Sequence, residues 1–502
     1  MEQQTEVERK FAVDEAFELG RVRWPDGVGL VPAGERVLTS TYLDTADLRL
    51  AARGVSLRRR SGGHDEGWHL KLPRGQDARE EIREPLEAGA DDAPPERLAA
   101  LVKAYARGRP LEPVARIRTT RAVHRLRAGG DGELVAELAD DHVAAEVVGA
   151  EPGARTWREI EVELVGGPPE LLHAAARALL EAGAVPSPAP SKLARALGPR
   201  FPARPQEQEL DVDGPAAAVV MTYLRAQVDA LLEADPGVRT DAPDAVHQMR
   251  VATRRLRTAL KTFRPVLARE HTDRLRGELR WIATVLGDAR DAEVLRRRLR
   301  EEAADAPPSA ERQAAVGRID SDLAARYDTA RAELLRELDG PRYLRLLDDL
   351  DTLLESPPLT ERAPAEARRE LPRLARRAFK AVRRAHGVAE SAGTDAALHE
   401  VRKAAKRARY AGEALRPAFG KRAKRFAAAM EAVQDVLGEH QDSVVARETL
   451  TTMAARARAA GQDTFHLGRL AEREATRAAA ARAAYAEAWR AASRKRLLRW
   501  TR

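Results

Sequence analysis

The sequence predicts a multidomain α+β protein, in which an antiparallel β-barrel or tunnel with accompanying helices precedes an all-helical part built from two related bundles. Three observations lead to this fold class. Residues 5–164 read as short alternating segments separated by glycine-rich turns. Beyond about residue 211 the chain changes to alanine, leucine and arginine with helical spacing. Within that helical part, one stretch of sequence occurs twice.

The length of 502 residues exceeds what one hydrophobic core normally serves. Proline-rich segments after a helical stretch at residues 170–182 mark the end of the strand-rich part. We therefore expect a first domain over residues 1–200, a linker over 201–211, and a helical domain over 212–502 with repeats at about 212–355 and 365–502.

The composition narrows the class of protein. Lys and Arg number 86 against 78 Asp and Glu, an excess that favours anionic partners. The absence of cysteine excludes disulfides and thiolate metal sites. The N-terminus lacks an apolar signal core, and no run is long and apolar enough to span a bilayer. We expect a cytoplasmic protein with no membrane partner.

Charged residues alternate with apolar ones along several predicted strands of the first domain. Glu159, Glu161 and Glu163 share one face of a strand, because side chains alternate with a period of two. A single charged face is normally a solvated one. Three glutamates on one face repel one another unless metal ions or neighbouring cations compensate them. A closed barrel with a charged lumen would supply both and could hold an extended anion.

The order and spacing of these charged segments resemble the CYTH family of triphosphate tunnel metalloenzymes. The resemblance begins with Glu6-x-Glu8-x-Lys10 and covers essentially residues 1–200. It continues through the segments Tyr42 to Thr45, Gly54 to Arg60, Lys71, Arg79 and Glu81, Arg118 and Arg121, Glu137 and Asp141, Glu159 to Glu163, and Ser191 and Lys192.

This resemblance implies hydrolysis of a triphosphate inside the tunnel with Mg²⁺ or Mn²⁺, since hard cations prefer carboxylate oxygens and can bridge phosphates. The implied metal ligands are Glu6, Glu8, Glu161, Glu163 and Asp141. The implied catalytic residues are Glu6, Glu8, Lys10, Glu161 and Glu163. The substrate is expected to contact Lys10, Arg58, Arg60, Lys71, Arg79, Arg118 and Lys192.

A basic stripe repeats in the helical part at an offset of 152 residues. In the first copy the stripe comprises His247, Arg250, Arg254, Arg257 and Lys261, and in the second His399, Arg402, Lys406 and Arg409. A solvated arginine face explains either helix alone. Like charges three and four residues apart destabilise a helix, however, and a bound polyanion would relieve them.

These stripes, together with the segments Leu286 to Asp291 and Leu437 to Asp442, resemble the CHAD family of conserved-histidine helical domains. The resemblance covers roughly residues 212–502 and implies binding of inorganic polyphosphate. Arg274 and Arg425 occupy equivalent places one helix later and are expected to extend the basic surface. Asp291 and Asp442 are expected to orient an arginine, because a carboxylate repels phosphate.

The resulting functional prediction is a triphosphatase tunnel linked to a polyphosphate-binding domain, with association with polyphosphate granules as a further expectation. Other reactions of the same tunnel remain open, namely adenylate cyclisation or thiamine triphosphate hydrolysis. A non-catalytic protein that binds or localises polyphosphate is a second alternative. Nucleic acid is disfavoured as a partner, because aromatic residues at 4% leave few platforms for base stacking.

Overall fold

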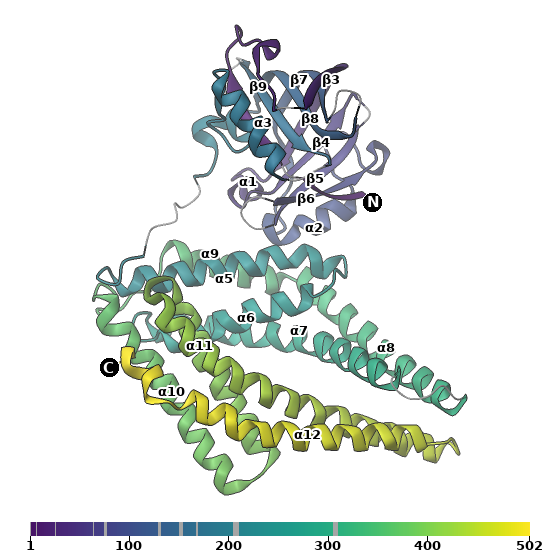
Figure 1. The fold of residues 1–502 in the computed structure, drawn as a ribbon, viewed down its shortest axis with the longest axis vertical. Coiled ribbons are helices and arrows are strands. Elements are labelled where there is room, and N and C mark those ends of the chain that lie inside the picture. Colours follow the sequence, from purple (N-terminus) through teal and green to yellow (C-terminus); the bar gives the residue numbers. More distant parts are fainter. Residues whose placement is uncertain are drawn as a thin grey trace. The chain divides into compact units, whose positions relative to one another are not determined.

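The computed structural model describes the chain apart from residues 1, 7, 26, 64, 75–77, 129–131, 150–153, 167–168, 204–209, 305–309 and 502. The chain divides into two compact units, Met1–Gln206 and Glu207–Arg502. The first unit is a curved sheet with helices, and the second is entirely helical in its described elements (Figure 1). This architecture confirms the predicted fold class, with one correction to the sheet.

The first unit contains a ten-stranded sheet in the order β1-β6-β5-β4-β3-β7-β8-β9-β2-β10. All neighbouring strands pair in the antiparallel sense. The strands are β1 Glu2–Glu6, β2 Glu8–Val13, β3 Val28–Asp44, β4 Ser56–Ser61, β5 Gly67–Arg74, β6 Ala78–Glu84, β7 Glu112–Ala128, β8 Leu134–Val147, β9 Arg155–Leu164 and β10 Val185–Pro186. Its helices are α1 Arg49–Ala52, α2 Glu96–Ala106, α3 Pro169–Glu181 and α4 Lys192–Leu197.

The sheet is not closed, so the predicted closed barrel is wrong in this respect. Strands β1 and β10 form its two edges in the described pairing. β1 ends at Glu6 and β2 begins at Glu8, although the two strands lie near opposite ends of the sheet. This one-residue link forces the sheet to curl. β1 and β2 run in the same direction, and two parallel strands can pair only if a long crossover connects them. A link of one residue is too short for such a connection.

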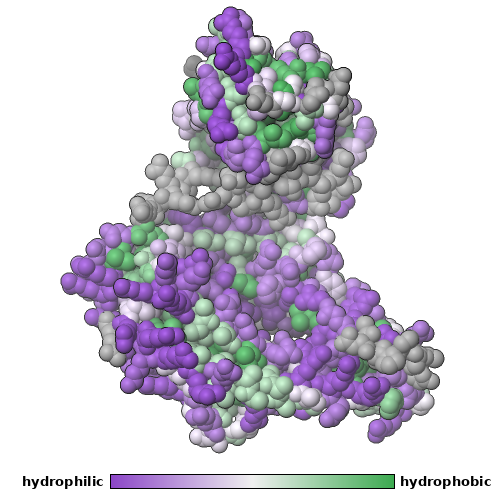
Figure 2. Space-filling view, in the orientation of Figure 1, coloured by the Kyte–Doolittle hydropathy of each residue, from purple (hydrophilic) through white to green (hydrophobic). Residues whose placement is uncertain are grey.

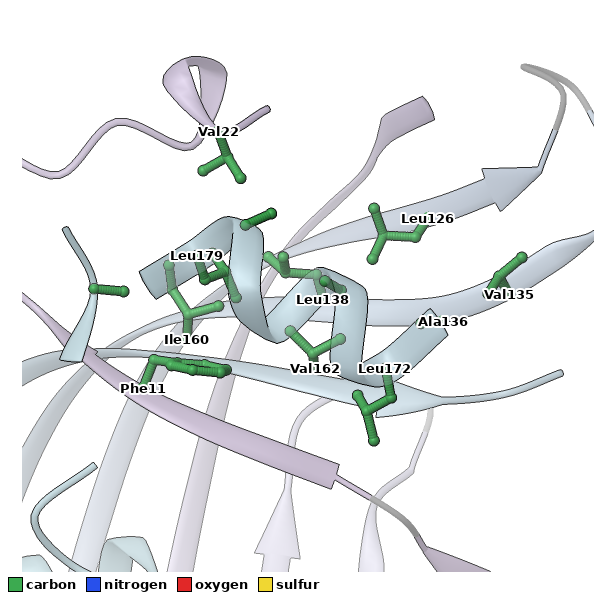
Figure 3. Close-up of a cluster of buried hydrophobic side chains, with 13 residues drawn as sticks. Phe11, Val22, Leu126, Val135, Ala136, Leu138, Ile160, Val162, Leu172 and Leu179 are labelled. Atoms are coloured by element: carbon green, nitrogen blue, oxygen red, sulfur yellow. The ribbon is translucent and has the colours of Figure 1, made fainter. Parts of the chain in front are cut away.

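Helix α3 covers one face of the curled sheet and anchors its hydrophobic core. Ile160 and Val162 of β9 and Leu138 of β8 pack with Leu172 and Leu179 of the helix (Figure 3). The predicted alternation on β9 is confirmed, since Ile160 and Val162 are fully buried on this side. The intervening glutamates therefore point to the concave side of the sheet.

The second unit is built from two similar sets of helices, which confirms the predicted duplication. Its helices are α5 Ala216–Arg239, α6 Ala245–Thr262, α7 Arg269–Ala304, α8 Ala310–Asp339, α9 Pro341–Glu355, α10 Ala367–Ala392, α11 Asp395–Ala459 and α12 Phe465–Ala492. Helix α11 is kinked at Gly420, whose φ of 54° favours glycine. The two parts of α11 thus correspond to α6 and α7, and α7–α8 and α11–α12 each run side by side (Figure 1).

The two repeats meet at equivalent residues. The Ala216 amide donates to the Ala365 carbonyl at 2.8 Å, and the Ala367 amide donates to the Gly214 carbonyl at 2.8 Å. Pro215 and Glu366 form the bridge between them. Such reciprocal contacts are those of a local two-fold axis.

Hydrophilic residues cover most of the helical unit in the space-filling view (Figure 2). None of the helices in the described part of the chain combines the length and apolarity needed to cross a membrane.

Candidate active site and basic helical surface

The concave side of the sheet carries a row of carboxylates on three adjacent strands. Glu8 of β2 is directly opposite Glu163 of β9, which is in turn opposite Glu137 of β8. All three line the cavity of the sheet, which has a volume of about 320 Å³. We call Glu8, Glu137 and Glu163 the carboxylate row and this space the sheet cavity.

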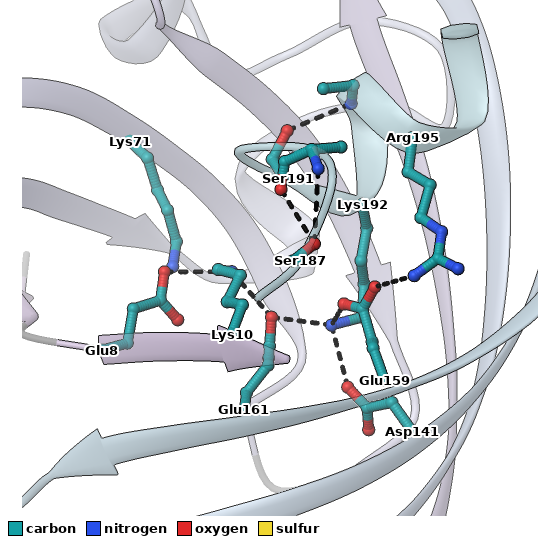
Figure 4. A network of polar contacts seen from close by, with 12 residues as sticks. Glu8, Lys10, Lys71, Asp141, Glu159, Glu161, Ser187, Ser191, Lys192 and Arg195 are labelled. Carbon is teal, nitrogen blue, oxygen red and sulfur yellow. Dashed lines mark hydrogen bonds and ion pairs between the residues drawn. The ribbon is translucent and has the colours of Figure 1, made fainter. Parts of the chain in front are cut away.

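Lys192 binds a second group of carboxylates beside this row (Figure 4). Its Nζ lies 2.8 Å from Asp141 Oδ2, 2.8 Å from Glu159 Oε1 and 2.8 Å from Glu161 Oε1. The lysine opens helix α4, where the Ser191 hydroxyl accepts a hydrogen bond from the Ala194 amide at 3.1 Å. Burial would lower the pKa of Lys192, but the three carboxylates raise it above its ordinary value.

Two further cations hold the central carboxylate of β9 in its ionised form. Lys10 Nζ lies 2.7 Å from Glu161 Oε1 and 3.0 Å from Glu8 Oε1. Arg121 binds Asp141 through two hydrogen bonds of 2.8 and 2.7 Å and reaches Glu161 Oε2 at 2.9 Å. Burial would raise the pKa of Glu161, but Lys10, Lys192 and Arg121 hold it well below its ordinary value.

The opposite wall of the sheet cavity is basic and is organised around one buried carboxylate, Glu81. This residue is 1% exposed, and its Oε1 lies 3.7 Å from Arg58 Nη2, 3.6 Å from Lys71 Nζ and 3.0 Å from His69 Nδ1. Burial would raise the pKa of Glu81, but His69, Lys71 and Arg58 lower it. Burial and the neighbouring Arg58 also lower the pKa of Arg60, as expected where cations crowd together.

The sheet cavity therefore offers both signs of charge: Lys10, Arg121 and Lys192 bind carboxylates of one wall, and Glu81 is buried within the basic one. Its basic lining residues are Lys10, Arg36, Arg58, Arg60, Lys71, Arg83, Arg121 and Lys192. Its acidic lining residues are Glu8, Asp65, Glu81, Glu137, Glu161 and Glu163. A ligand that fits both walls is an anion accompanied by cations.

The helical unit contains a basic pocket of about 390 Å³ between α6, α7 and α11, which we call the anion pocket. Its basic lining residues are Arg254, Arg257, Lys261, Arg276, Arg280, Lys403, Lys406 and Arg407, and its acidic lining residue is Asp273. Burial lowers the pKa of Lys406 to about 6, and Arg254, Arg402 and Arg250 act in the same direction. The pocket thus crowds positive charges together, and without a bound anion this crowding disfavours the charged form of Lys406.

An arginine–aspartate pair flanks this pocket in each repeat. Arg250 Nη1 lies 2.6 Å from Asp291 Oδ1, and Arg402 Nη2 lies 3.8 Å from Asp442 Oδ1. The orienting role predicted for the two aspartates agrees with these contacts.

Comparison with known proteins identifies both halves. A CYTH domain model matches residues 4–197, and a CHAD domain model matches residues 222–451. Uncharacterized protein Rv2226 of Mycobacterium tuberculosis strain H37Rv is 40% identical over 496 residues, which cover 94% of this chain and 93% of the relative. The chain belongs to the CYTH–CHAD family.

Solved structures are similar to one or the other domain. PptA from Streptomyces chartreusis matches with a TM-score of 0.48 and 22% identity, over 55% of this chain and 99% of its own. The CHAD domain from Ricinus communis matches with a TM-score of 0.46 and 26% identity, over 57% of this chain and 96% of its own. A putative adenylate cyclase from Bacillus halodurans matches with a TM-score of 0.26 and 19% identity, over 39% of this chain and 98% of its own.

The structure brings most of the predicted CYTH residues together. Glu8, Lys10, Arg58, Arg60, Lys71, Glu161, Glu163 and Lys192 all line the sheet cavity. Glu6 and Arg79 are paired across β1 and β6, but their side chains lie outside the described residues. Asp141 is fully buried behind the cavity and is bound by Arg121 and Lys192.

Arg118 does not join this group, because it is exposed on the other face of β7. Two residues three positions apart in a strand face opposite sides, and Arg121 occupies the inner one. Arg36, opposite Arg121 on β3, also lines the sheet cavity. Arg36 was not predicted from the sequence as a site residue, although its cross-strand partner Arg121 is among the residues that carry the CYTH resemblance.

The predicted CHAD residues divide into three groups. Arg254, Arg257, Lys261 and Lys406 line the anion pocket, while Arg250 and Arg402 flank it through their aspartates. Arg409, Arg274 and Arg425 lie elsewhere: Arg409 binds Glu413 at 2.6 Å, Arg274 binds Asp349 at 2.7 Å, and Arg425 is exposed. His247 is exposed and His399 is partly buried, each one turn before its arginine.

Sequence reasoning missed four basic side chains of the anion pocket. They are Arg276 and Arg280 of α7, and Lys403 and Arg407 of α11, with Tyr410 as their aromatic neighbour. Arg276 and Arg280 are one turn apart, so a second basic stripe on the helix after the first one was the available signal.

CYTH tunnel enzymes depend on metal ions, and the oxygen donors of the carboxylate row are of the kind that hard divalent cations prefer. Glu8, Glu137 and Glu163 present hard oxygen ligands at adjacent positions of one cavity wall. The ligand atoms of Asp141, Glu159 and Glu161 also lie within 4.8 Å of one another. That cluster already binds the Lys192 ammonium, so it fits a metal ion only if the lysine moves.

Proposed function

We propose that the CYTH domain hydrolyses inorganic triphosphate or a related triphosphate with Mg²⁺ or Mn²⁺, and that the CHAD domain binds inorganic polyphosphate. The single observation that supports the enzymatic part is that the carboxylate row and a cluster of arginines and lysines line the same cavity. Phosphoryl transfer depends on positioning and charge neutralisation more than on covalent chemistry. Both requirements are met by side chains of this cavity.

The basic wall would bind the phosphate oxygens. Arg58, Arg60 and Lys71 project from neighbouring strands, and the buried Glu81 fixes Arg58 and Lys71 in place. Lys10 lies between the two walls, within 3.0 Å of Glu8 and 2.7 Å of Glu161, where it can contact a phosphate bound beside the acidic wall.

The carboxylate row would hold the metal. A bound Mg²⁺ or Mn²⁺ supplies Lewis-acid polarisation of phosphate and water oxygens. Lys10, Arg121 and Lys192 offset the negative charge of Glu161, which would otherwise repel the phosphates.

Substitution of Glu8 tests the enzymatic proposal. Glu8→Gln removes one metal ligand at nearly constant volume, so we expect phosphate release from tripolyphosphate to fall sharply and Mn²⁺ binding to weaken. Glu146→Gln is the matched control, because Glu146 is an exposed glutamate of β8 outside the cavity lining. Equal activity of both variants and the parent chain would refute the tunnel mechanism.

A substrate panel separates the alternatives within the family. Tripolyphosphate, ATP and thiamine triphosphate are each offered with Mg²⁺ and with Mn²⁺. Formation of a cyclic nucleotide from ATP would favour a cyclase, and phosphate release from none of the three would favour a purely polyphosphate-binding protein.

The anion pocket supports the polyphosphate part of the proposal. Its cations come from three helices and include Lys406, whose pKa is lowered to about 6 by burial and by the neighbouring arginines Arg254, Arg402 and Arg250. We expect Lys406→Ser to weaken polyphosphate binding, and displacement of polyphosphate by RNA at equal phosphate concentration to fail at physiological salt. Location in the cytoplasm and on polyphosphate granules can be tested by microscopy of the tagged chain.

A further inference from the structure

The two repeats of the CHAD domain carry side chains of opposite charge at two pairs of corresponding positions. Lys261 of the first repeat corresponds to Glu413 of the second, and Arg280 corresponds to Glu431. Glu413 and Glu431 bind Arg409 at 2.6 and 2.8 Å. The two glutamates thus neutralise Arg409 of the second repeat, whereas the first repeat carries Lys261 and Arg280 at the corresponding positions.

A groove of about 950 Å³ adjoins the anion pocket at Lys261, where residues of the first repeat meet α10 of the second, and we call it the α10 groove. The two spaces share Lys261 and Arg407. The other basic residues of the groove are Arg264, Arg362 and Arg377, its acidic residues are Glu270 and Glu361, and its apolar floor includes Pro265, Ala268, Leu359, Leu374, Ala378 and Ala381. The groove therefore continues the basic surface beyond the pocket.

Helix α10 itself carries a long basic face, on which Arg373 pairs with Glu370 at 3.5 Å. The sequence between Glu370 and Glu390 contains no carboxylate. Its exposed cations are Arg373, Arg376, Arg377, Lys380, Arg383 and Arg384. Like charges three and four residues apart each destabilise a helix by about 0.2–0.5 kcal/mol, so a bound polyanion would relieve this face.

We propose that a long polyphosphate chain leaves the anion pocket past Lys261 and Arg407 and continues through the α10 groove, so that the CHAD domain binds long chains more tightly than short ones. This inference rests on the proposed polyphosphate binding. Glu413 and Glu431 place negative charge at the corresponding positions of the second repeat, which makes the path asymmetric despite the two-fold fold.

A matched pair of charge reversals on α10 tests the path in the full-length protein. Arg377 lines the groove, whereas its exposed neighbour Arg376 projects from the helix 100° away and does not line it. Affinity is measured with polyphosphate of about one hundred phosphates and a fixed salt concentration. Occupancy of the anion pocket by tripolyphosphate is followed separately, as protection of Lys403 and Lys406 from an amine-reactive reagent detected by peptide mass spectrometry.

We expect Arg377→Glu to weaken long-chain binding about tenfold, the loss expected for a charge-assisted contact, with a much smaller effect on protection by tripolyphosphate. Arg376→Glu should leave the long-chain affinity within about twofold of the parent value. Equal losses in the two variants would show diffuse attraction to α10 and overturn the path, as would no loss in either.

A separate result of the same experiment tests the proposed polyphosphate binding itself. If no polyphosphate of any length protects Lys403 or Lys406 in the parent chain, polyphosphate binding at the anion pocket is refuted. If protection is seen but Arg377→Glu and Arg376→Glu behave alike, only the groove path is refuted.

Discussion

Lys192 compensates the most crowded carboxylates of the CYTH domain, and its removal has a predictable cost. Lys192→Ala would leave three carboxylates facing one another with ligand atoms within 4.8 Å. Removing one partner of a buried ion pair typically costs about 3–5 kcal/mol. We expect faster hydrogen exchange of β8 and β9 in the variant when a chelator is present.

The same variant should gain affinity for divalent cations. A bound Mn²⁺ would stabilise the folded variant by mass action and restore the slow exchange of β8 and β9. Arg195→Ala provides the control, because Arg195 lies on the same helix but its Nη1 is 3.6 Å from Glu159. Equal losses in both variants, or no recovery with Mn²⁺, would contradict this account.

Lys406 makes a pH-dependent prediction for the CHAD domain. Its charged neighbours are Arg250 and Arg254 on α6, Arg402 on its own helix, and Asp442 beyond the kink, which acts in the opposite direction. Its pKa is about 6 in the folded state and 10.5 ordinarily, so the unfolded chain binds more protons between these values. This group therefore makes the fold more stable as pH rises from about 6 to 10.5, and the contribution is lost as pH falls through 6.

Polyphosphate is expected to raise the pKa of Lys406, because an anion favours the charged ammonium. Binding near pH 7 should then take up protons, which calorimetry in buffers of different ionisation enthalpy detects. Lys406→Met removes the titrating group and should reduce this uptake, whereas unchanged uptake would assign it to another residue.

At the residue scale, sequence reasoning located most of the CYTH site because alternation and the family resemblance agree there. It failed where both faces of a strand carry arginine, as at Arg118 and Arg121, since composition does not reveal which face is concave. In the CHAD domain, Arg409 is bound by Glu413 four residues later, which the sequence shows, and by Glu431 on a different part of α11, which it does not. Such contacts depend on tertiary packing.

At the level of elements, duplication supplies matched glycines on corresponding helices. A Cβ on Gly287 of α7 would meet Arg250 at 3.8 Å, an ordinary contact. A Cβ on Gly438 of α11 would meet Arg402 Nη2 at 3.3 Å, so Arg402 would have to shift. Alanine in place of glycine in a helix contributes about 1 kcal/mol through propensity.

We therefore expect Gly287→Ala to raise the thermal midpoint of the CHAD domain more than Gly438→Ala does. Gly438→Ala should also weaken polyphosphate binding, because the displaced Arg402 flanks the anion pocket. Differential scanning calorimetry and binding assays on both variants check this. Identical behaviour of the two would show that Arg402 moves freely.

The helices and strands could be predicted from the sequence more completely than whether the sheet closes into a barrel. Helical spacing and the repeat offset predicted two related bundles, and the structure contains them. Closure of the sheet was not predictable from alternation, because it depends on which strands pair. The one-residue link between β1 and β2 brings the ends of the sheet together without hydrogen bonding them.

At the scale of the whole molecule, one chain joins a domain proposed to cut phosphate chains to one proposed to hold them. Linked sites act on a shared ligand at an effective concentration that can reach the millimolar range for flexible connections. A polyphosphate held by the CHAD domain would thus be presented repeatedly to the sheet cavity. Tripolyphosphate has only three phosphates, so we expect it to gain less from the linkage than a long chain.

The ratio of kcat/KM for long polyphosphate to that for tripolyphosphate measures this coupling. We expect Arg254→Ser combined with Lys406→Ser to lower the ratio, because both residues line the anion pocket. Arg274→Ser, an exposed arginine bound to Asp349 outside that pocket, should preserve it. A ratio unaffected by the double substitution would mean that the two domains act on separate phosphate chains.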